Sequence, residues 1–289
     1  MKAVIRNLLV ALTITAAMTV HASAREETKA GQPALLTEDT HIASDTPGID
    51  LFIRNKRPRD VELSAAKILL YVHGATYPAT TAFDLQLDGM SWMDYIAAQG
   101  WDVYLLDLRG YGLSSRPPGM DQPAKDNAPI VTTDVAVRDV GAAVDYILKR
   151  RKVSKISLLG WSWGTSIMAT YAAANNEKVN KLALYAPLWL RTTPGLIGGD
   201  GPLGAYRAVT KESARKRWLT GVPDDKQAAL IPDGWFDAWA DATWATDPKA
   251  KDSGQLRAPN GVIQDVREYW GSGRPYYDPA NIRVPTLLI

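Results

Sequence analysis

The stretch that decides the fold is Lys155–Asn176, KISLLGWSWGTSIMATYAAANN. Its first part, Ile156–Leu159, is a continuous apolar run, which is typical of a strand buried on both faces. Its last part, Gly164–Ala174, has apolar residues at helical spacing. Ser162 lies between the two parts, with a glycine two positions before it and another two positions after it. The stretch therefore predicts a strand, a sharp turn that presents a serine, and a helix.

Strand and helix patterns alternate on both sides of this turn. Short apolar runs predict buried strands, whereas apolar residues at a spacing of 3.6 predict helices. The predicted buried strands are 68–72, 103–106, 182–186 and 286–289, and the further predicted helices are 91–99 and 134–150. In the helix 91–99, Trp92, Met93 and Ile96 share the face that we expect to be inward. The alternation predicts an α/β fold with a mostly parallel sheet and flanking helices.

The residues before this region have two further signals. Residues 34–63 alternate polar and apolar side chains around a turn at Thr46–Gly48, which predicts two antiparallel strands. Residues 1–24 have a basic start, an apolar stretch and an Ala-Ser-Ala end, which is the layout of a secretory signal peptide. We therefore expect cleavage after Ala24 and an exported protein, periplasmic or extracellular, with no stable membrane anchor after cleavage.

The composition narrows the range of partners. Without Lys2 and Arg6 of the predicted signal peptide, the basic and acidic residues are equal in number, at 31 each, and no basic block stands out. Nucleic acid is therefore an unexpected partner. The chain has no cysteine, so it has no disulfide and no thiolate metal site. We expect neither a cofactor nor a bound metal, and the sequence leaves the oligomeric state open.

A long connection separates the strands 182–186 and 286–289. It carries six of the ten tryptophans, which are Trp189, Trp218, Trp235, Trp239, Trp244 and Trp270. An aromatic-rich insertion of this length predicts a mostly helical cap over a ligand pocket, and the alternative is additional core. The predicted division is thus a core at 25–187, a cap at 188–275 and the start of the last part of the core at 276–289.

The serine turn has the features of a nucleophile site. Gly160 and Gly164 would let the strand and helix approach closely, and the helix N-terminus would favour negative charge near Ser162. Upstream, the strand 68–72 runs into His73-Gly74-Ala75, and Gly74 would let this backbone come close as well. The backbone amides of Ala75 and Trp163 are the predicted donors of an oxyanion hole.

Four stretches together resemble the α/β-hydrolase superfamily: YVHGAT, DLRGYGLSSRP, GWSWGT and NIRVPTLLI. The resemblance covers about residues 65–289 and implies the α/β-hydrolase fold with Ser162 as catalytic nucleophile. The form GWSWGT is also similar to the proline iminopeptidase branch. The resemblance further implies that Asp107 and Arg109 brace a loop and take no part in catalysis.

The resemblance also implies a chain order of serine, then acid, then histidine. The acid would follow the strand 286–289 and the histidine would come later, so we expect both beyond Ile289, in a longer form of the protein, with the last strand and helix of the fold. His73 suits a bracing role in the oxyanion loop better than that of a base.

The function predicted on these grounds is a secreted serine hydrolase that cleaves a small-molecule ester or amide through an acyl-Ser162 intermediate. One alternative is an aminopeptidase, in which Asp237 or Asp241 would bind the substrate amine. A second alternative is a non-catalytic member of the fold that binds an apolar ligand, because the acid and the base are not visible in the sequence.

Overall fold

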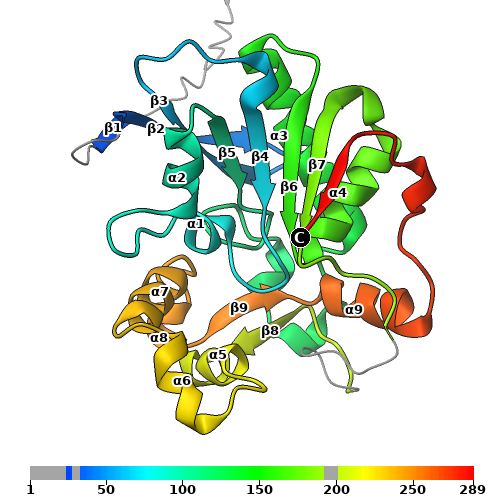
Figure 1. The fold of residues 1–289 in the computed structure, drawn as a ribbon. Coiled ribbons are helices and arrows are strands. Elements are labelled where there is room, and N and C mark those ends of the chain that lie inside the picture. The colour runs from blue at the N-terminus through cyan, green and yellow to red at the C-terminus, as the bar shows by residue number, and fades with distance from the viewer. Residues whose placement is uncertain (1–23, 28–32, 192–200) are drawn as a thin grey trace, which may run out of the picture.

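An eight-stranded sheet forms the centre of the computed structural model, which describes residues 24–27, 33–191 and 201–289 (Figure 1). Its strands are β1 (Ala24–Glu27), β2 (Leu35–Ala43), β3 (Asp50–Pro58), β4 (Ile68–Val72), β5 (Asp102–Leu106), β6 (Ile156–Trp161), β7 (Val179–Tyr185) and β10 (Thr286–Leu288). They lie in the order β1-β2-β3-β5-β4-β6-β7-β10. Strands β5, β4, β6, β7 and β10 are parallel, and β1, β2 and β3 join them antiparallel. The predicted α/β architecture and its strands are confirmed.

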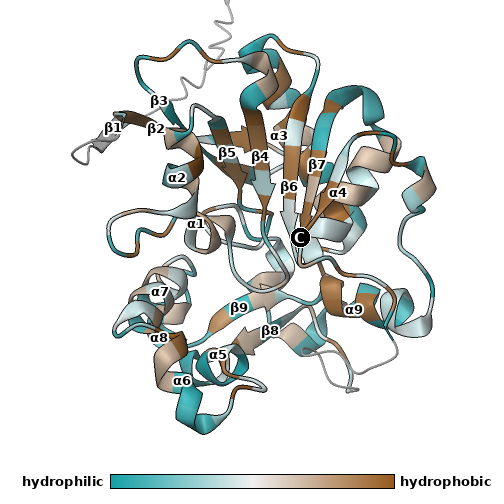
Figure 2. Ribbon diagram, viewed as in Figure 1, coloured by the Kyte–Doolittle hydropathy of each residue, from teal (hydrophilic) through white to brown (hydrophobic). Residues whose placement is uncertain are grey.

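Helices cover both faces of the sheet. They are α1 (Ala79–Ala82), α2 (Trp92–Ala98), α3 (Thr133–Arg151) and α4 (Trp163–Ala174). The side chains of β4 alternate between the two faces: Leu70 and Val72 pack with α3 and α4, whereas Leu69 and Tyr71 pack with α1 and α2. Both faces are therefore apolar, and Figure 2 shows the central strands as the most hydrophobic part of the ribbon.

Helix α2 departs from the prediction at one residue. Met93 is fully buried and Ile96 is partly buried, as expected for the inward face. Trp92, in contrast, has 40% of its surface exposed. Its ring packs edge-on against Phe83 and Tyr185, near the carboxyl ends of the strands. The helical spacing places Trp92 correctly near the sheet but does not distinguish packed core from the wall of a cavity.

The elements from β8 to α9, in the segment between β7 and β10, lie at the carboxyl ends of the parallel strands (Figure 1). These elements are β8 (Tyr206–Val209), α5 (Lys211–Trp218), α6 (Asp224–Leu230), α7 (Trp235–Trp244), α8 (Ala250–Ser253), β9 (Leu256–Pro259) and α9 (Gly261–Glu268). We call residues 206–259 the cap. The sequence predicts its helices as a group but not its two-stranded antiparallel sheet of β8 and β9.

Some predictions fall on residues outside the described ranges. The predicted signal peptide, 1–24, is outside them except for Ala24, and so are residues 192–200 of the predicted cap segment. In the parts of the chain that the structure describes, no helix combines the length and the apolar character needed to cross a membrane.

Candidate functional site

Ser162 occupies the turn between β6 and α4. It is the residue that caps the N-terminus of α4, and its backbone has φ 53° and ψ −118°. Side-chain-bearing residues rarely adopt this conformation, so the surrounding structure must hold it. The Ser162 amide donates a hydrogen bond of 2.9 Å to the carbonyl oxygen of Tyr185, on the neighbouring strand β7. The strained turn presents a partly exposed serine at the carboxyl end of the sheet.

Two glycines make this turn sterically feasible. A Cβ atom on Gly160 would lie 2.3 Å from the carbonyl oxygen of Gly164. A Cβ atom on Gly164 would lie 2.5 Å from the carbonyl oxygen of Val72, at the end of β4. Both distances are shorter than any real contact, and both neighbours are backbone atoms that cannot move away independently. The glycines therefore allow α4 to begin directly against β4 and β6.

The loop after β4 passes beside the serine. We call His73–Thr76 the oxyanion loop, after its predicted role. A Cβ atom on Gly74 would lie 3.6 Å from Ser162 Oγ, so the loop backbone passes directly beside the hydroxyl. The backbone amides of Ala75 and Trp163 donate no hydrogen bond to any residue that the structure describes. They are thus free to donate to a ligand, and the Trp163 amide lies in the first turn of α4, where the helix dipole favours negative charge.

His73 is fully buried and uses both ring nitrogens within its own surroundings. Nδ1 lies 2.7 Å from the Gly74 carbonyl oxygen, to which it donates, and Nε2 accepts a hydrogen bond of 3.2 Å from the Leu108 amide. Burial lowers the pKa of His73 to about 4, against the opposing effect of the Gly74 carbonyl. The imidazole is therefore neutral at pH 7 and braces the oxyanion loop.

The hydroxyl of Ser162 has no hydrogen-bonded base among the described side chains. Activation of a serine nucleophile needs such a base. The structure thus brings together the serine and the two free amides, and His73 lies beside them without reaching the hydroxyl.

Aromatic side chains hold the two residues whose amides are the predicted oxyanion donors. Trp163 is fully buried, and its Nε1 donates a hydrogen bond of 2.8 Å to Thr133 Oγ1 on α3. Tyr111 packs against the His73 ring at 4.7 Å between centroids. The Tyr111 hydroxyl donates to the Ala75 carbonyl oxygen at 3.0 Å. These contacts limit the movement of Ala75 and Trp163, the two residues that carry the free amides.

Asp107 and Arg109 brace the loop after β5. Asp107 is fully buried and accepts hydrogen bonds from the Thr80 and Leu113 amides at 3.1 and 3.0 Å. Burial raises the pKa of Asp107, while these hydrogen bonds oppose the shift. The guanidinium of Arg109 forms an ion pair with buried Asp139 at 2.5 Å. Each side chain is occupied in structural contacts.

A cavity of about 510 Å³ lies between the core and the cap, next to the serine turn. Trp161, which immediately precedes Ser162, forms part of its wall, as does Tyr77, which immediately follows the oxyanion loop. The residues that line it are Tyr77, Thr81, Ala82, Phe83, Leu85, Leu87, Met90, Trp92, Trp161, Trp218, Trp235 and Trp239. None of them is charged. The buried Tyr77 hydroxyl has no hydrogen-bond partner in the described chain.

The tryptophans of the long connection divide into three groups. Trp218, Trp235 and Trp239 line the cavity. Trp244 and Trp270 are buried in hydrophobic clusters, the first within the cap and the second against the main core. Trp189 lies on the surface and packs against Tyr277. Three of these tryptophans thus lie in the wall of the cavity, and two are part of the hydrophobic core.

The two acids considered for amine binding lie elsewhere. Asp241 is 72% exposed and forms an ion pair with Lys211 on the cap surface. Asp237 is also exposed, and neither residue lines the aromatic cavity.

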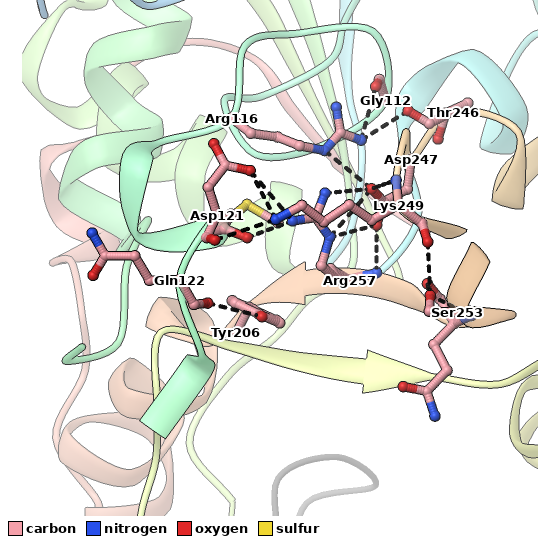
Figure 3. A network of polar contacts seen from close by, with 12 residues as sticks. Gly112, Arg116, Asp121, Gln122, Tyr206, Thr246, Asp247, Lys249, Ser253 and Arg257 are labelled. Carbon is pink, nitrogen blue, oxygen red and sulfur yellow. Dashed lines mark hydrogen bonds and ion pairs between the residues drawn. The ribbon is translucent and has the colours of Figure 1, made fainter. Parts of the chain in front are cut away.

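A polar network fastens the cap to the core loop that follows β5 (Figure 3). Arg257 of β9 forms a two-point ion pair with the buried carboxylate of Asp247, with Nη2 2.5 Å from Oδ1 and Nε 3.0 Å from Oδ2. Arg116 of the core loop donates to the Thr246 carbonyl oxygen at 2.8 Å. Lys249 pairs with Asp121 of the same loop at 3.2 Å. The network fixes the position of β9 and of its partner strand β8.

Sequence reasoning missed three residues around the site: Tyr77, Tyr111 and Arg207. Tyr77 has a weak signal, because it directly follows the YVHGAT stretch. Arg207, on β8, donates to the Ala75 carbonyl oxygen at 2.6 Å, a contact that no local pattern indicates. No group of three or more histidine, aspartate or glutamate side chains in the described ranges is placed to hold a metal ion.

Comparison with known proteins agrees with this architecture. Residues 67–203 match the alpha/beta hydrolase fold family. The human serine hydrolase BPHL is 31% identical over 150 residues, a match that spans 46% of this chain and 45% of the human protein. The chain thus matches less than half the length of this curated relative.

One solved structure shows the same fold over most of the chain. A thioesterase domain from the curacin biosynthetic pathway superimposes with a TM-score of 0.51 at 16% identity, over 87% of this chain and 82% of that domain. Potato (Solanum tuberosum) epoxide hydrolase I matches with a TM-score of 0.39 at 21% identity, over 55% of this chain and 43% of that one.

Proposed function

The chain belongs to the α/β-hydrolase superfamily, and from this premise we propose that it is a serine hydrolase that cleaves a carboxylic ester or amide through an acyl intermediate on Ser162. The observation that carries the proposal is the convergence of a strained, partly exposed serine with the two unpaired amides of Ala75 and Trp163. This is the arrangement that acyl transfer requires, a nucleophile beside donors for the developing oxyanion.

The reaction follows from these groups in two halves. Ser162 Oγ bonds to the carbonyl carbon, its proton passes to a general base, and the alcohol or amine leaves with that proton. Water then attacks the acyl-serine and releases the carboxylic acid. The amides of Ala75 and Trp163 donate to the oxyanion in both halves, and each such donor contributes about 3 to 4 kcal/mol to transition-state stabilisation.

The general base is a requirement of the proposal that the described side chains do not meet. His73 is neutral and occupied at both ring nitrogens. In the superfamily order of serine, acid and histidine, the base and its supporting acid both follow the serine in the chain.

The aromatic cavity supports an apolar substrate group. It is uncharged, adjoins both Trp161 and Tyr77, and has a volume in the range of small-molecule sites. An ester or amide with a neutral apolar acyl or alcohol group fits these walls better than a charged amine does. The exposed positions of Asp237 and Asp241 remove the support for the aminopeptidase alternative. We also propose, from the N-terminal stretch, that the protein is exported.

A hydrolysis assay with two serine variants tests the proposal. Purified protein is incubated with p-nitrophenyl esters of increasing acyl length and with alanine and proline arylamides. We expect ester hydrolysis that Ser162→Ala abolishes, and a covalent mass increase on Ser162 after treatment with an aryl fluorophosphonate. Ser166→Ala is the matched control, because this buried serine lies in α4 and its hydroxyl has no partner. Equal activity in the wild type and Ser162→Ala, without a covalent adduct, would contradict the proposal.

A second candidate is a non-catalytic protein that binds an apolar ligand in the same cavity. The observation that favours it is the Ser162 hydroxyl without a described base. Three cavity tryptophans would then report binding through their fluorescence. A saturable fluorescence change with a neutral aromatic ester, without turnover or adduct, would favour this candidate over the hydrolase.

A further inference from the structure

Arg207 connects the cap to the oxyanion loop. It lies on β8, and its Nη2 donates to the Ala75 carbonyl oxygen at 2.6 Å and to Thr76 Oγ1 at 2.9 Å. Its Nη1 donates to the Pro259 carbonyl oxygen on β9 at 2.6 Å. A single planar side chain therefore joins the cap sheet to the loop beside Ser162.

The charge of Arg207 is unusual because its acceptors are all neutral. No carboxylate in the described chain forms an ion pair with it. Arg257 and Arg109, in contrast, each form an ion pair with a buried aspartate. Burial lowers the pKa of Arg207, yet a guanidinium remains protonated at any ordinary pH. An unneutralised positive charge thus lies against the oxyanion loop, where a negative charge would develop during acyl transfer.

The Ala75 carbonyl is held from two sides. Tyr111 of the core and Arg207 of the cap both donate to it, at 3.0 and 2.6 Å. This carbonyl belongs to the Ala75–Thr76 peptide, so the two hydrogen bonds fix the side of residue 75 that follows its Cα. The Gly74–Ala75 peptide, which carries the predicted oxyanion donor, is directly adjacent, and its Gly74 carbonyl oxygen accepts from His73. Removal of the cap donor would leave the residue with one hydrogen bond in place of two.

The strand that carries Arg207 is itself rigidly placed. Ala208 is the register partner of Arg257, which is anchored to Asp247 and to the core loop (Figure 3). At the start of β8, the Ala205 amide donates to the Ala124 carbonyl oxygen of that loop at 2.8 Å. Arg207 is therefore held at a fixed position relative to the oxyanion loop.

We propose that Arg207 is a positioning residue for the reaction at Ser162: it holds the Ala75 amide in its donor orientation and places a positive charge beside the oxyanion. The inference rests on the proposed function. If Arg207 has this role, the oxyanion hole is complete only when the cap is in its observed position on the core. Arg207 acts through the loop and through its field, and the substrate binds in the aromatic cavity.

The test compares Arg207→Met, Arg207→Lys and a matched control, Arg217→Met. Arg217 lies on α5 of the same cap and acts on Arg207 and Tyr77 through its charge alone, with no hydrogen bond to the oxyanion loop, so it controls for loss of a nearby cap charge without loss of the contact to Ala75. With a neutral p-nitrophenyl ester, we expect Arg207→Met to lower kcat by about 10- to 100-fold while KM changes by less than about twofold. Arg207→Lys keeps the charge and one hydrogen bond, and should recover part of the loss. Arg217→Met should stay within about twofold of the wild type.

Hydrogen exchange gives a second measurement that does not depend on turnover. The amides of Ala75 and Thr76 should exchange faster in Arg207→Met and at the wild-type rate in Arg217→Met. An unchanged kcat, or an effect confined to KM, would overturn the inference even if exchange became faster. Loss of activity in Ser162→Ala together with full activity in Arg207→Met would refute the role of Arg207 alone. Equal activity of wild type and Ser162→Ala would instead refute the proposed function, and the role of Arg207 with it.

Discussion

Gly74 lies directly beside the side chain of Ser162, where the neighbouring strands β4 and β6 end. A Cβ atom on Gly74 would lie 3.1 Å from Ser162 Cβ and 3.6 Å from Ser162 Oγ. The loop after β4 therefore passes directly alongside the serine side chain, and its next residue presents a free amide. A side chain at position 74 would therefore press on Ser162 Cβ and lie in contact with the serine hydroxyl.

Gly74→Ala should impair catalysis more than stability. The added methyl group would be tight against a single atom, Ser162 Cβ at 3.1 Å, and would meet no backbone atom closer than 3.4 Å. We expect the protein to fold, and kcat on a p-nitrophenyl ester to fall by at least about 10-fold because the hydroxyl and the oxyanion loop are pushed apart. Steady-state kinetics and urea unfolding measure the two effects. Wild-type kcat in a folded variant would show that the loop does not bear on the reaction.

Gly160→Ala should destabilise the fold itself. Its Cβ atom would lie 2.3 Å from the Gly164 carbonyl oxygen, and β6 and α4 are both fixed by packing. We expect a loss of at least about 3 kcal/mol in the free energy of unfolding. Gly141→Ala in α3 is the control, because its Cβ atom would meet only Tyr171 Cε2, at an ordinary 3.7 Å. The control should be neutral or gain about 0.5 to 1 kcal/mol from helix propensity. Equal stability of the two variants would argue against the close approach at Gly160.

The sequence predicted those parts of the fold that depend on local periodicity. The strand β4 reads as a continuous apolar run because its side chains alternate between two buried faces, as Leu69 and Leu70 do. The two glycines predict the turn at Ser162 because each avoids a nearby clash. A side chain on the first would meet the turn itself, and a side chain on the second would meet the adjacent strand. Local pattern and tertiary structure impose the same requirement at these positions.

The rest depends on contacts between distant segments. The hydrogen bond from Arg207 to Ala75 joins residues 132 positions apart, so the local sequence around either residue does not predict it. The strands β8 and β9 are only four residues long and contain arginines, so they lack the apolar run of a buried strand. Trp92 has the helical spacing of a core residue, yet its ring faces the cavity, because spacing does not specify what lies opposite a face.

His73→Asn should weaken the dependence of stability on pH in mildly acidic solution. The unfolded chain protonates this histidine near pH 6.5, whereas the folded chain does so only near pH 4. The unfolded state thus binds more protons in this window, and the wild type loses up to about 3 kcal/mol as the pH falls from 6.5 to 4. Asparagine can retain the hydrogen bond to the Gly74 carbonyl without titrating. Urea unfolding at several pH values measures both slopes, and equal slopes would contradict the buried, neutral state of His73.

Asp265→Asn should stabilise the protein at alkaline pH and have little effect near pH 4. The buried Asp265 carboxylate accepts a hydrogen bond of 2.6 Å from the Thr133 amide, yet burial raises its pKa from 3.8 to about 6. The folded state therefore binds more protons between these values, and stability is lost as the pH rises from 3.8 to 6. Asparagine retains an acceptor for Thr133 without the buried charge, so we expect a gain of up to about 3 kcal/mol at pH 8. Asp145→Asn is the control. Asp145 lies on α3, is exposed and pairs with Lys178, so its replacement should change the free energy of unfolding by less than about 1 kcal/mol at either pH. Thermal unfolding at pH 4 and pH 8 measures the difference, and a gain for Asp265→Asn of equal size at both would show that the buried charge is not its source.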